Sequence, residues 1–111
     1  MTPLLVALGA GFGAPLRYLT GHWLDRGLPW GTLLVNLFGS AMLGALLGAA
    51  VDGNWLALLG TGFCGGLTTY STFAVQTVQG GPRRGSAYAV MTVTGCLAAA
   101  TLGHLAATAL T

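Results

Sequence analysis

The chain has 111 residues, and only 5% of them are charged, against roughly 25% in soluble domains. The formal net charge is +2, from four arginines and two aspartates that are scattered along the sequence. So few charges cannot cover a soluble helical bundle, and so weak a positive charge does not make a nucleic-acid-binding surface. Hydrophobic residues make up 54% of the chain, which indicates an all-α membrane protein.

Four stretches are long and apolar enough to cross a bilayer as helices, which takes about 20 residues each. We predict one transmembrane domain whose four spans run over residues 3–21, 30–51, 55–78 and 85–110. Polar breaks separate the spans at His22–Pro29, at a tight turn Asp52-Gly53-Asn54, and at Gln79–Arg84. Glycines recur four residues apart and predict close helix packing. Four helices this thin hardly enclose a pathway alone, so we expect an oligomer.

Two polar side chains stand out within the first two spans. Arg17 follows Gly11-Phe12-Gly13-Ala14-Pro15-Leu16, where a membrane arginine costs a few kcal/mol or more. It either extends its guanidinium to the membrane interface or attracts anions at a vestibule, and the two roles are compatible. Asn36 carries an uncharged amide that donates two hydrogen bonds. It either joins two helices or lines a pore.

The third span contains Gly65-Gly66-Leu67-Thr68-Thr69-Tyr70-Ser71-Thr72-Phe73, which is poor helix sequence. We predict that this helix is broken at mid-membrane, where non-helical backbone has to be buried in protein or line a cavity. The carbonyl groups of such a break can coordinate a cation. The alternative is a continuous helix in which Ser and Thr hydroxyls bond back to the preceding turn.

The predicted spans contain neither Asp nor Glu. Proton-coupled exporters of cationic compounds normally need a membrane carboxylate, which disfavours that class of protein. Guanidinium, amide and hydroxyl donors suit an anion instead, and the positive edges of aromatic rings add to them. Weak binding by such groups permits fast passage. The sequence shows no nucleophile–base pair, metal cluster or phosphate-binding loop, so we do not expect an enzyme.

Taken together, these segments resemble the Fluc family of fluoride channels, also called CrcB. The resemblance covers the whole chain and rests on three motifs, in residues 11–18, 31–39 and 65–73. It implies an antiparallel dimer in the cell membrane with two fluoride pathways. It also implies a structural sodium ion at the dimer centre, held by the backbone carbonyls of Gly65 and Thr68 and not transported.

The resemblance further implies roles for individual side chains. Arg17 would belong to the vestibule. The fluoride pathway would include residues from the second, third and fourth spans, namely Asn36, Tyr70, Ser71, Thr72, Phe73, Tyr88 and Thr92, with Cys96 further along the same face of the fourth helix. Tyr70 departs from the family, which usually has Phe there, and this leaves the local geometry open.

The predicted function is passive, fluoride-selective conduction that lowers fluoride toxicity in the cytoplasm. One alternative is a non-conducting partner subunit of a heterodimeric fluoride channel, and a less favoured one is a small four-helix cation exporter. Arg26, Arg83 and Arg84 share one side of the membrane, while the second loop and both termini carry neither Lys nor Arg. Positive loops stay cytoplasmic, so both termini should face outward. This bias motivates a heterodimer with a related chain of opposite bias.

Overall fold

The computed structural model describes residues 2–26 and 28–110, including their side chains except those of Arg26, Leu28 and Ser71. The first helix, α1, spans Thr2–Leu24, and the short antiparallel strands β1 (Asp25–Arg26) and β2 (Leu28–Pro29) follow it. The helix α2 spans Trp30–Gly48. The next segment consists of α3 (Gly53–Trp55), the π-helix η1 (Leu56–Cys64), α4 (Gly65–Leu67) and α5 (Ser71–Gln79). The chain then ends in α6, Gly81–Leu110.

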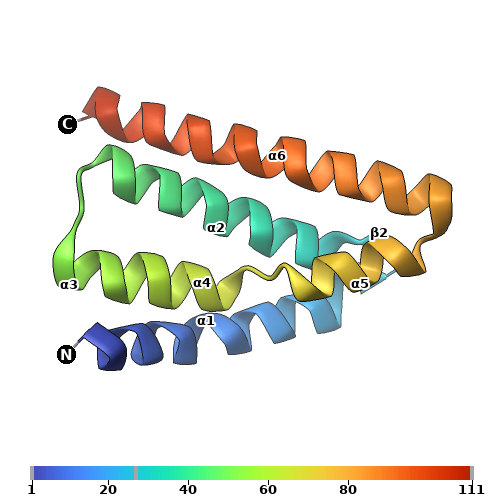
Figure 1. Ribbon diagram of the computed structural model, residues 1–111, viewed down its shortest axis with the longest axis horizontal. Helices are drawn as coiled ribbons and strands as arrows, with labels where there is room; N and C mark the ends of the chain where they lie inside the picture. The colour runs from blue at the N-terminus through green and yellow to red at the C-terminus, as the bar shows by residue number, and fades with distance from the viewer. Residues whose placement is uncertain (1, 27, 111) are drawn as a thin grey trace.

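The elements lie roughly side by side along the long axis of the molecule (Figure 1). α6 packs along α2, and α1 packs along η1 and α4. Both ends of the chain lie at one end of the molecule, together with the connection between α2 and α3 (Figure 1). The β1–β2 hairpin and the turn between α5 and α6 lie at the opposite end. Three helices, α1, α2 and α6, are long and apolar enough to cross a membrane.

Backbone contacts at glycine hold neighbouring helices together. A Cβ atom built on Gly9 of α1 would overlap the carbonyl oxygen of Leu58 in η1. A Cβ on Gly44 of α2 would overlap the carbonyl oxygen of Ala100 in α6. Helices approach this closely in membranes because small residues remove the side chain between two backbones.

The end of α2 differs from the sequence prediction. The span was expected to run to Val51, with a turn at Asp52-Gly53-Asn54, but α2 ends at Gly48. The reason is Ala50, whose φ of 58° is left-handed, which reverses the chain. The amide of Val51 donates to the carbonyl of Leu46 at 2.9 Å and that of Ala50 to the carbonyl of Leu47 at 3.1 Å, the pattern of a Schellman cap. The turn therefore precedes Gly53, which begins α3.

Two other helices also extend beyond their predicted spans. α1 continues to Leu24, past the expected end at Gly21, so that His22 and Trp23 are helical. α6 begins at Gly81, before the expected start at Gly85. In both cases residues beyond the apolar run continue the helix, because helical hydrogen bonding does not end where apolar sequence ends.

Large apolar side chains are exposed over most of the isolated chain. Phe12, Val78 and Leu110 are 71%, 80% and 88% exposed, and many other leucines and valines are similar. Lipid covers such side chains in a bilayer, so exposure of this kind is expected of a multi-pass membrane protein. The buried core is small and includes Leu33, Val35 and Leu67.

Candidate functional site

The chain leaves the helical conformation between α4 and α5. α4 ends at Leu67, Thr68 has extended backbone (φ −83°, ψ 160°), and α5 begins at Ser71. The Thr68 amide and hydroxyl both donate to the carbonyl of Cys64, at 2.9 and 2.8 Å. They cap the end of α4, so the threonine closes one helix before the chain starts the next. The depth of this interruption in a membrane stays a prediction.

The side chain of Asn36 in α2 is hydrogen-bonded to the interrupted segment. Its Nδ2 donates to the Thr69 carbonyl at 3.2 Å, and its Oδ1 accepts from the Thr69 amide at 2.9 Å. The side-chain amide therefore takes the place of a neighbouring peptide group, and it is only 6% exposed. This contact joins α2 to the interrupted segment, while the role of Asn36 in lining a pore stays a prediction. One Nδ2 hydrogen remains beyond this pair of bonds.

The hydrogen bonds around the interruption leave two carbonyl groups without their usual helical donors. In a continuous helix the Thr69 amide would donate to Gly65 and the Thr72 amide to Thr68. Here the Thr69 amide donates to Asn36, and the Thr72 amide donates to the Thr69 hydroxyl at 3.2 Å. Gly65 and Thr68 also line one groove. Their carbonyl oxygens are hard ligands of the kind that an alkali cation takes.

Three aromatic rings form a row beside this segment. The ring centroids of Tyr70 and Phe73 lie 5.9 Å apart with an interplanar angle of 48°. Those of Phe73 and Tyr88 lie 5.5 Å apart at 42°. Tilted pairs at these distances turn the positive edge of one ring towards the face of the next. Tyr70 is 79% exposed, whereas Tyr88 is only 2% exposed, so the row leads from the surface into the protein.

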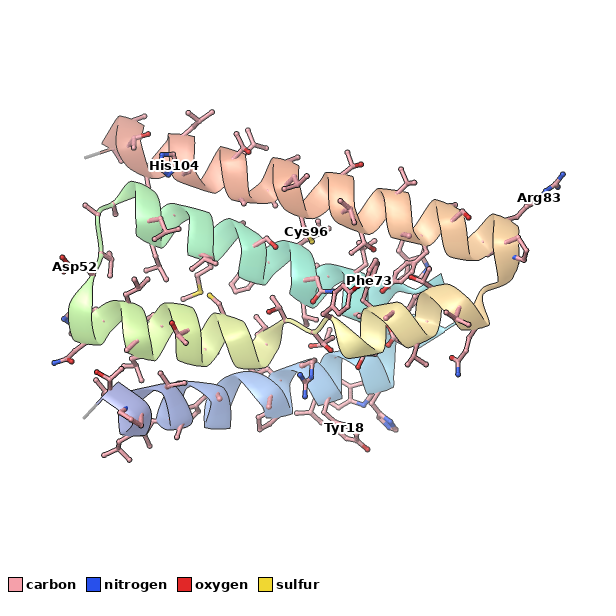
Figure 2. All side chains as sticks on the ribbon, viewed as in Figure 1. Tyr18, Asp52, Phe73, Arg83, Cys96 and His104 are labelled. Atoms are coloured by element: carbon pink, nitrogen blue, oxygen red, sulfur yellow. The ribbon has the colours of Figure 1, made fainter. Side chains whose placement is uncertain are left out.

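An open groove of about 630 Å³ connects most of the predicted site residues. It lies between α2, the α3–α5 segment and α6. Figure 2 shows Phe73 between the α5 ribbon and α6, with Cys96 on the inner side of α6. The groove is lined by six of the predicted residues and by Cys96, namely Asn36, Gly65, Thr68, Tyr70, Phe73, Thr92 and Cys96.

The hydroxyl of Thr92 is the most unusual polar group in the groove. Thr92 is 5% exposed, and its Oγ1 completes no hydrogen bond within the part of the chain that is described. The Tyr88 hydroxyl is close enough to act as its hydrogen-bond partner after a small shift. A buried hydroxyl that completes no hydrogen bond costs about 1–3 kcal/mol, so Thr92 gains from an acceptor, either the Tyr88 oxygen or a ligand.

A second, polar hollow of about 330 Å³ lies near the hairpin end of the molecule. Its lining includes Asp25, Gln76, Arg84 and Tyr88. Asp25 and Gln76 were not predicted as site residues. Gln76 is a strongly polar side chain inside the third predicted span. Such polarity within a span indicates a candidate site residue, and the prediction did not use it. Asp25 had no such signal, because it lies in a predicted loop.

The remaining predicted residues lie away from the groove. Arg17 is half-buried on α1, one turn beyond Gly13, whose backbone touches the end of α4. Among the described residues its guanidinium completes neither a hydrogen bond nor an ion pair, and it lines neither hollow. Thr72 is exposed and contributes its amide to the interruption. The side chain of Ser71 lies outside the described residues.

Comparison with known proteins gives a single family. The family described as "CrcB-like protein, Camphor Resistance (CrcB)" matches residues 4–104. A fluoride-specific ion channel, FluC 2, of Rhodococcus jostii is 60% identical over 80 residues, which cover 70% of each chain. FluC of Bordetella petrii is 43% identical over 117 aligned positions, covering 96% of this chain and 91% of the relative. FluC 1 of Streptomyces avermitilis is 48% identical over 87 residues, covering 71% and 70%. The chain belongs to the CrcB family of multi-pass membrane proteins.

Proposed function

We propose that this chain forms a channel through which fluoride ions leave the cell down their electrochemical gradient. The choice of fluoride as the ion rests on the relatives that are named fluoride-specific ion channels. The observation that carries the proposal for this chain is the buried Thr92 hydroxyl, which completes no hydrogen bond among the described residues, although the Tyr88 oxygen lies near it. A fluoride ion accepts such a hydrogen bond strongly, because it is small and charged.

The aromatic row and the groove complete the proposed pathway. The rings of Phe73 and Tyr70 line the same groove as Thr92 and have weakly positive edges, and the spare hydrogen of Asn36 offers one more donor. Among the described residues that line this groove, none is charged. An uncharged set of donors replaces part of the hydration shell without trapping the anion.

The cellular role follows from the acid–base chemistry of the ion. Hydrogen fluoride is a weak acid that crosses membranes in its neutral form and ionises in the cytoplasm. The anion is then trapped, because its charge prevents return through the lipid. A passive channel lets it out and lowers fluoride toxicity without an energy source.

We further propose that the carbonyls of Gly65 and Thr68 hold a structural sodium ion. The diversion of both usual helical donors, the amides of Thr69 and Thr72, supports this assignment. Two oxygens are too few to replace the water around a cation, so a second chain would have to supply further ligands. The ion would fix the interrupted backbone and would not be transported.

The proposed assembly is an antiparallel dimer of this chain or a heterodimer with a related chain. Arg83 and Arg84 lie at the hairpin end, where Figure 2 shows Arg83 projecting from the molecule, while the termini lie at the other end. This charge bias favours one orientation in the membrane and therefore a partner of opposite bias. The names of two relatives, FluC 2 and FluC 1, carry numbers that suit paired chains.

Fluoride efflux from liposomes tests the proposed function. Vesicles loaded with potassium fluoride, with a potassium ionophore and without a proton gradient, should release fluoride when they contain the purified chain. A cation exporter would release none under these conditions. A chain that needs a partner would conduct only with its companion, and no efflux in either case contradicts the channel.

Substitution of Thr92 links this efflux to the proposed pathway. Thr92→Val removes the hydroxyl but keeps the shape, and we expect it to lower fluoride flux about tenfold, the effect of one hydrogen bond to a charged group. The matched control is Thr101→Val on the same helix, because the Thr101 hydroxyl is exposed and donates to the Leu97 carbonyl at 2.8 Å. Equal flux in both variants would rule out the role of Thr92.

A further inference from the structure

A chain of hydrogen bonds joins four elements, β1, α2, α5 and α6, at the hairpin end of the molecule. The carboxylate of Asp25 lies over the first turn of α2, where Oδ1 accepts from the Thr32 amide at 3.0 Å and Oδ2 from the Thr32 hydroxyl at 2.9 Å. The positive end of a helix dipole favours a carboxylate at this place. The same Oδ2 accepts from Nε2 of Gln76 in α5 at 3.2 Å.

Gln76 extends this chain of hydrogen bonds to Tyr88 of α6. Its Oε1 lies 3.1 Å from the Tyr88 hydroxyl oxygen. An ionised carboxylate has no hydrogen to donate, so the amide nitrogen of Gln76 has to face Asp25. The amide oxygen therefore faces Tyr88, and the Tyr88 hydroxyl has to be the donor. The direction of each bond therefore follows from the charge of Asp25.

This direction decides what Tyr88 offers to the groove. Tyr88 ends the aromatic row next to Phe73 and lies near the Thr92 hydroxyl, which can donate its hydrogen to the Tyr88 oxygen. With its hydrogen committed to Gln76, Tyr88 can present only oxygen lone pairs to its other neighbours. An anion beside Thr92 therefore receives no hydrogen bond from Tyr88 while Asp25 holds Gln76 in place.

We propose that Asp25 is a positioning residue that sets the direction of the Tyr88 hydroxyl through Gln76 and so withholds one donor from the anion pathway. The effect on conduction rests on the proposed function, whereas the effect on Tyr88 does not. Asp25 lies in the polar hollow and not in the groove. Its influence on an anion in the groove is transmitted through the two hydrogen bonds of Gln76.

Asp25→Asn should reverse the direction of the hydrogen bonds from residue 25 through Gln76 to Tyr88. The substitution keeps the shape of the side chain. The new amide nitrogen donates to the Gln76 oxygen, which turns the Gln76 nitrogen towards Tyr88 and makes the phenol oxygen an acceptor. The Tyr88 hydrogen is then free for the groove. We expect fluoride flux to rise about tenfold, since one hydrogen bond to a charged group is gained.

A double-mutant cycle separates this mechanism from simple charge repulsion. In the Tyr88→Phe background the hydroxyl is absent, so Asp25→Asn should leave fluoride flux unchanged. An equal rise in both backgrounds would mean that Asp25 acts only by its charge, and a fall in both would mean that it acts only on folding. Either result would overturn the proposal. The matched control is Asp52→Asn, because Asp52 is the other carboxylate, is exposed and makes no side-chain cap bond to α3.

A vibrational measurement tests the positioning step without any fluoride. The Raman doublet of tyrosine distinguishes a phenol that donates a hydrogen bond from one that accepts it. Subtracting the spectrum of Tyr88→Phe isolates Tyr88 from the other two tyrosines. The unsubstituted chain should show a donor at Tyr88, and Asp25→Asn should show an acceptor. An unchanged doublet would refute the positioning role even in a conducting channel.

The two proposals can fail separately. If the doublet switches but no variant passes fluoride, the hydrogen-bond direction stands and the proposed function falls. If Asp25→Asn does not fold, Gln76→Met removes the bridge instead. It should likewise raise flux only where Tyr88 is present. An equal rise of flux in Gln76→Met and in the double variant with Tyr88→Phe would contradict the proposal.

Discussion

The two halves of the molecule join their helices in different ways. Near the termini, backbones touch directly at Gly9 and Gly44, and the hydroxyls of Thr101 and Thr108 bond within their own helix. Near the hairpin, glycine contacts recur, but hydrogen bonds of Asn36 and Gln76 also cross between helices. The first half is held by packing, and the second by packing together with polar links.

This difference bears on where the proposed pathway would pass. Backbone packing at glycine leaves little room and presents satisfied peptide groups. Polar links keep donors and acceptors inside the protein, and changing one partner changes what the others can bind. The groove and the polar hollow adjoin these links, and they meet at the ring pair of half-buried Phe73 and buried Tyr88.

Asn36→Leu should have the largest effect, because it removes the link to the interruption. The Thr69 amide and carbonyl would each lose the hydrogen bond to the Asn36 side chain, at a cost of about 3 kcal/mol. We expect earlier unfolding in mixed micelles of mild detergent and SDS, and loss of fluoride flux. Asn54→Leu is the control, since Asn54 is the other asparagine and is exposed in α3. Equal stability of the two variants would mean that the polar links contribute nothing.

Gly9→Ala tests the packed half of the molecule. The added methyl group would overlap the Leu58 carbonyl, so η1 has to move away from α1 at a cost of about 2 kcal/mol. Gly11→Ala on the same helix meets no atom within 4 Å and provides the matched control. The comparison is made by SDS unfolding of both variants. If Gly11→Ala destabilises as much as Gly9→Ala, helix contact is not the cause.

Ala50→Gly should have the smallest effect, and it should be stabilising. The left-handed φ of 58° at Ala50 costs about 1 kcal/mol, which glycine does not incur. We expect a slightly higher unfolding midpoint and unchanged flux, because the cap lies at the packed end. Ala49→Gly should lower the midpoint instead, since Ala49 has an ordinary φ of −82°. A change of flux in Ala50→Gly would show that the two halves are coupled.

Membrane character was predictable from the sequence, because it depends on composition and on the length of apolar runs. Low helix propensity at Gly65-Gly66 and the following threonines also predicted a helix break in the segment where α4 ends and α5 begins. The ends of the helices were harder to predict from the sequence. The end of α2 depends on the left-handed backbone of Ala50. Glycine is the residue that usually adopts this conformation, so nothing in the sequence indicated it at an alanine.

The site was predicted only in part, for a physical reason. Asn36, Phe73, Tyr88 and Thr92 were identified by motif and spacing, and the structure brings them around neighbouring hollows. Gln76 was missed although it lies within a span. Its partners are 51 residues before it and 12 residues after it in the chain, and only folding brings these side chains together.

The position of both chain ends at the same end of the molecule has a practical consequence for the proposed dimer (Figure 1). A short flexible tether between two copies would allow only a parallel pair. A tether containing one extra membrane-crossing helix would allow only an antiparallel pair. Of these two fused proteins, only the second should release fluoride if the subunits face in opposite directions.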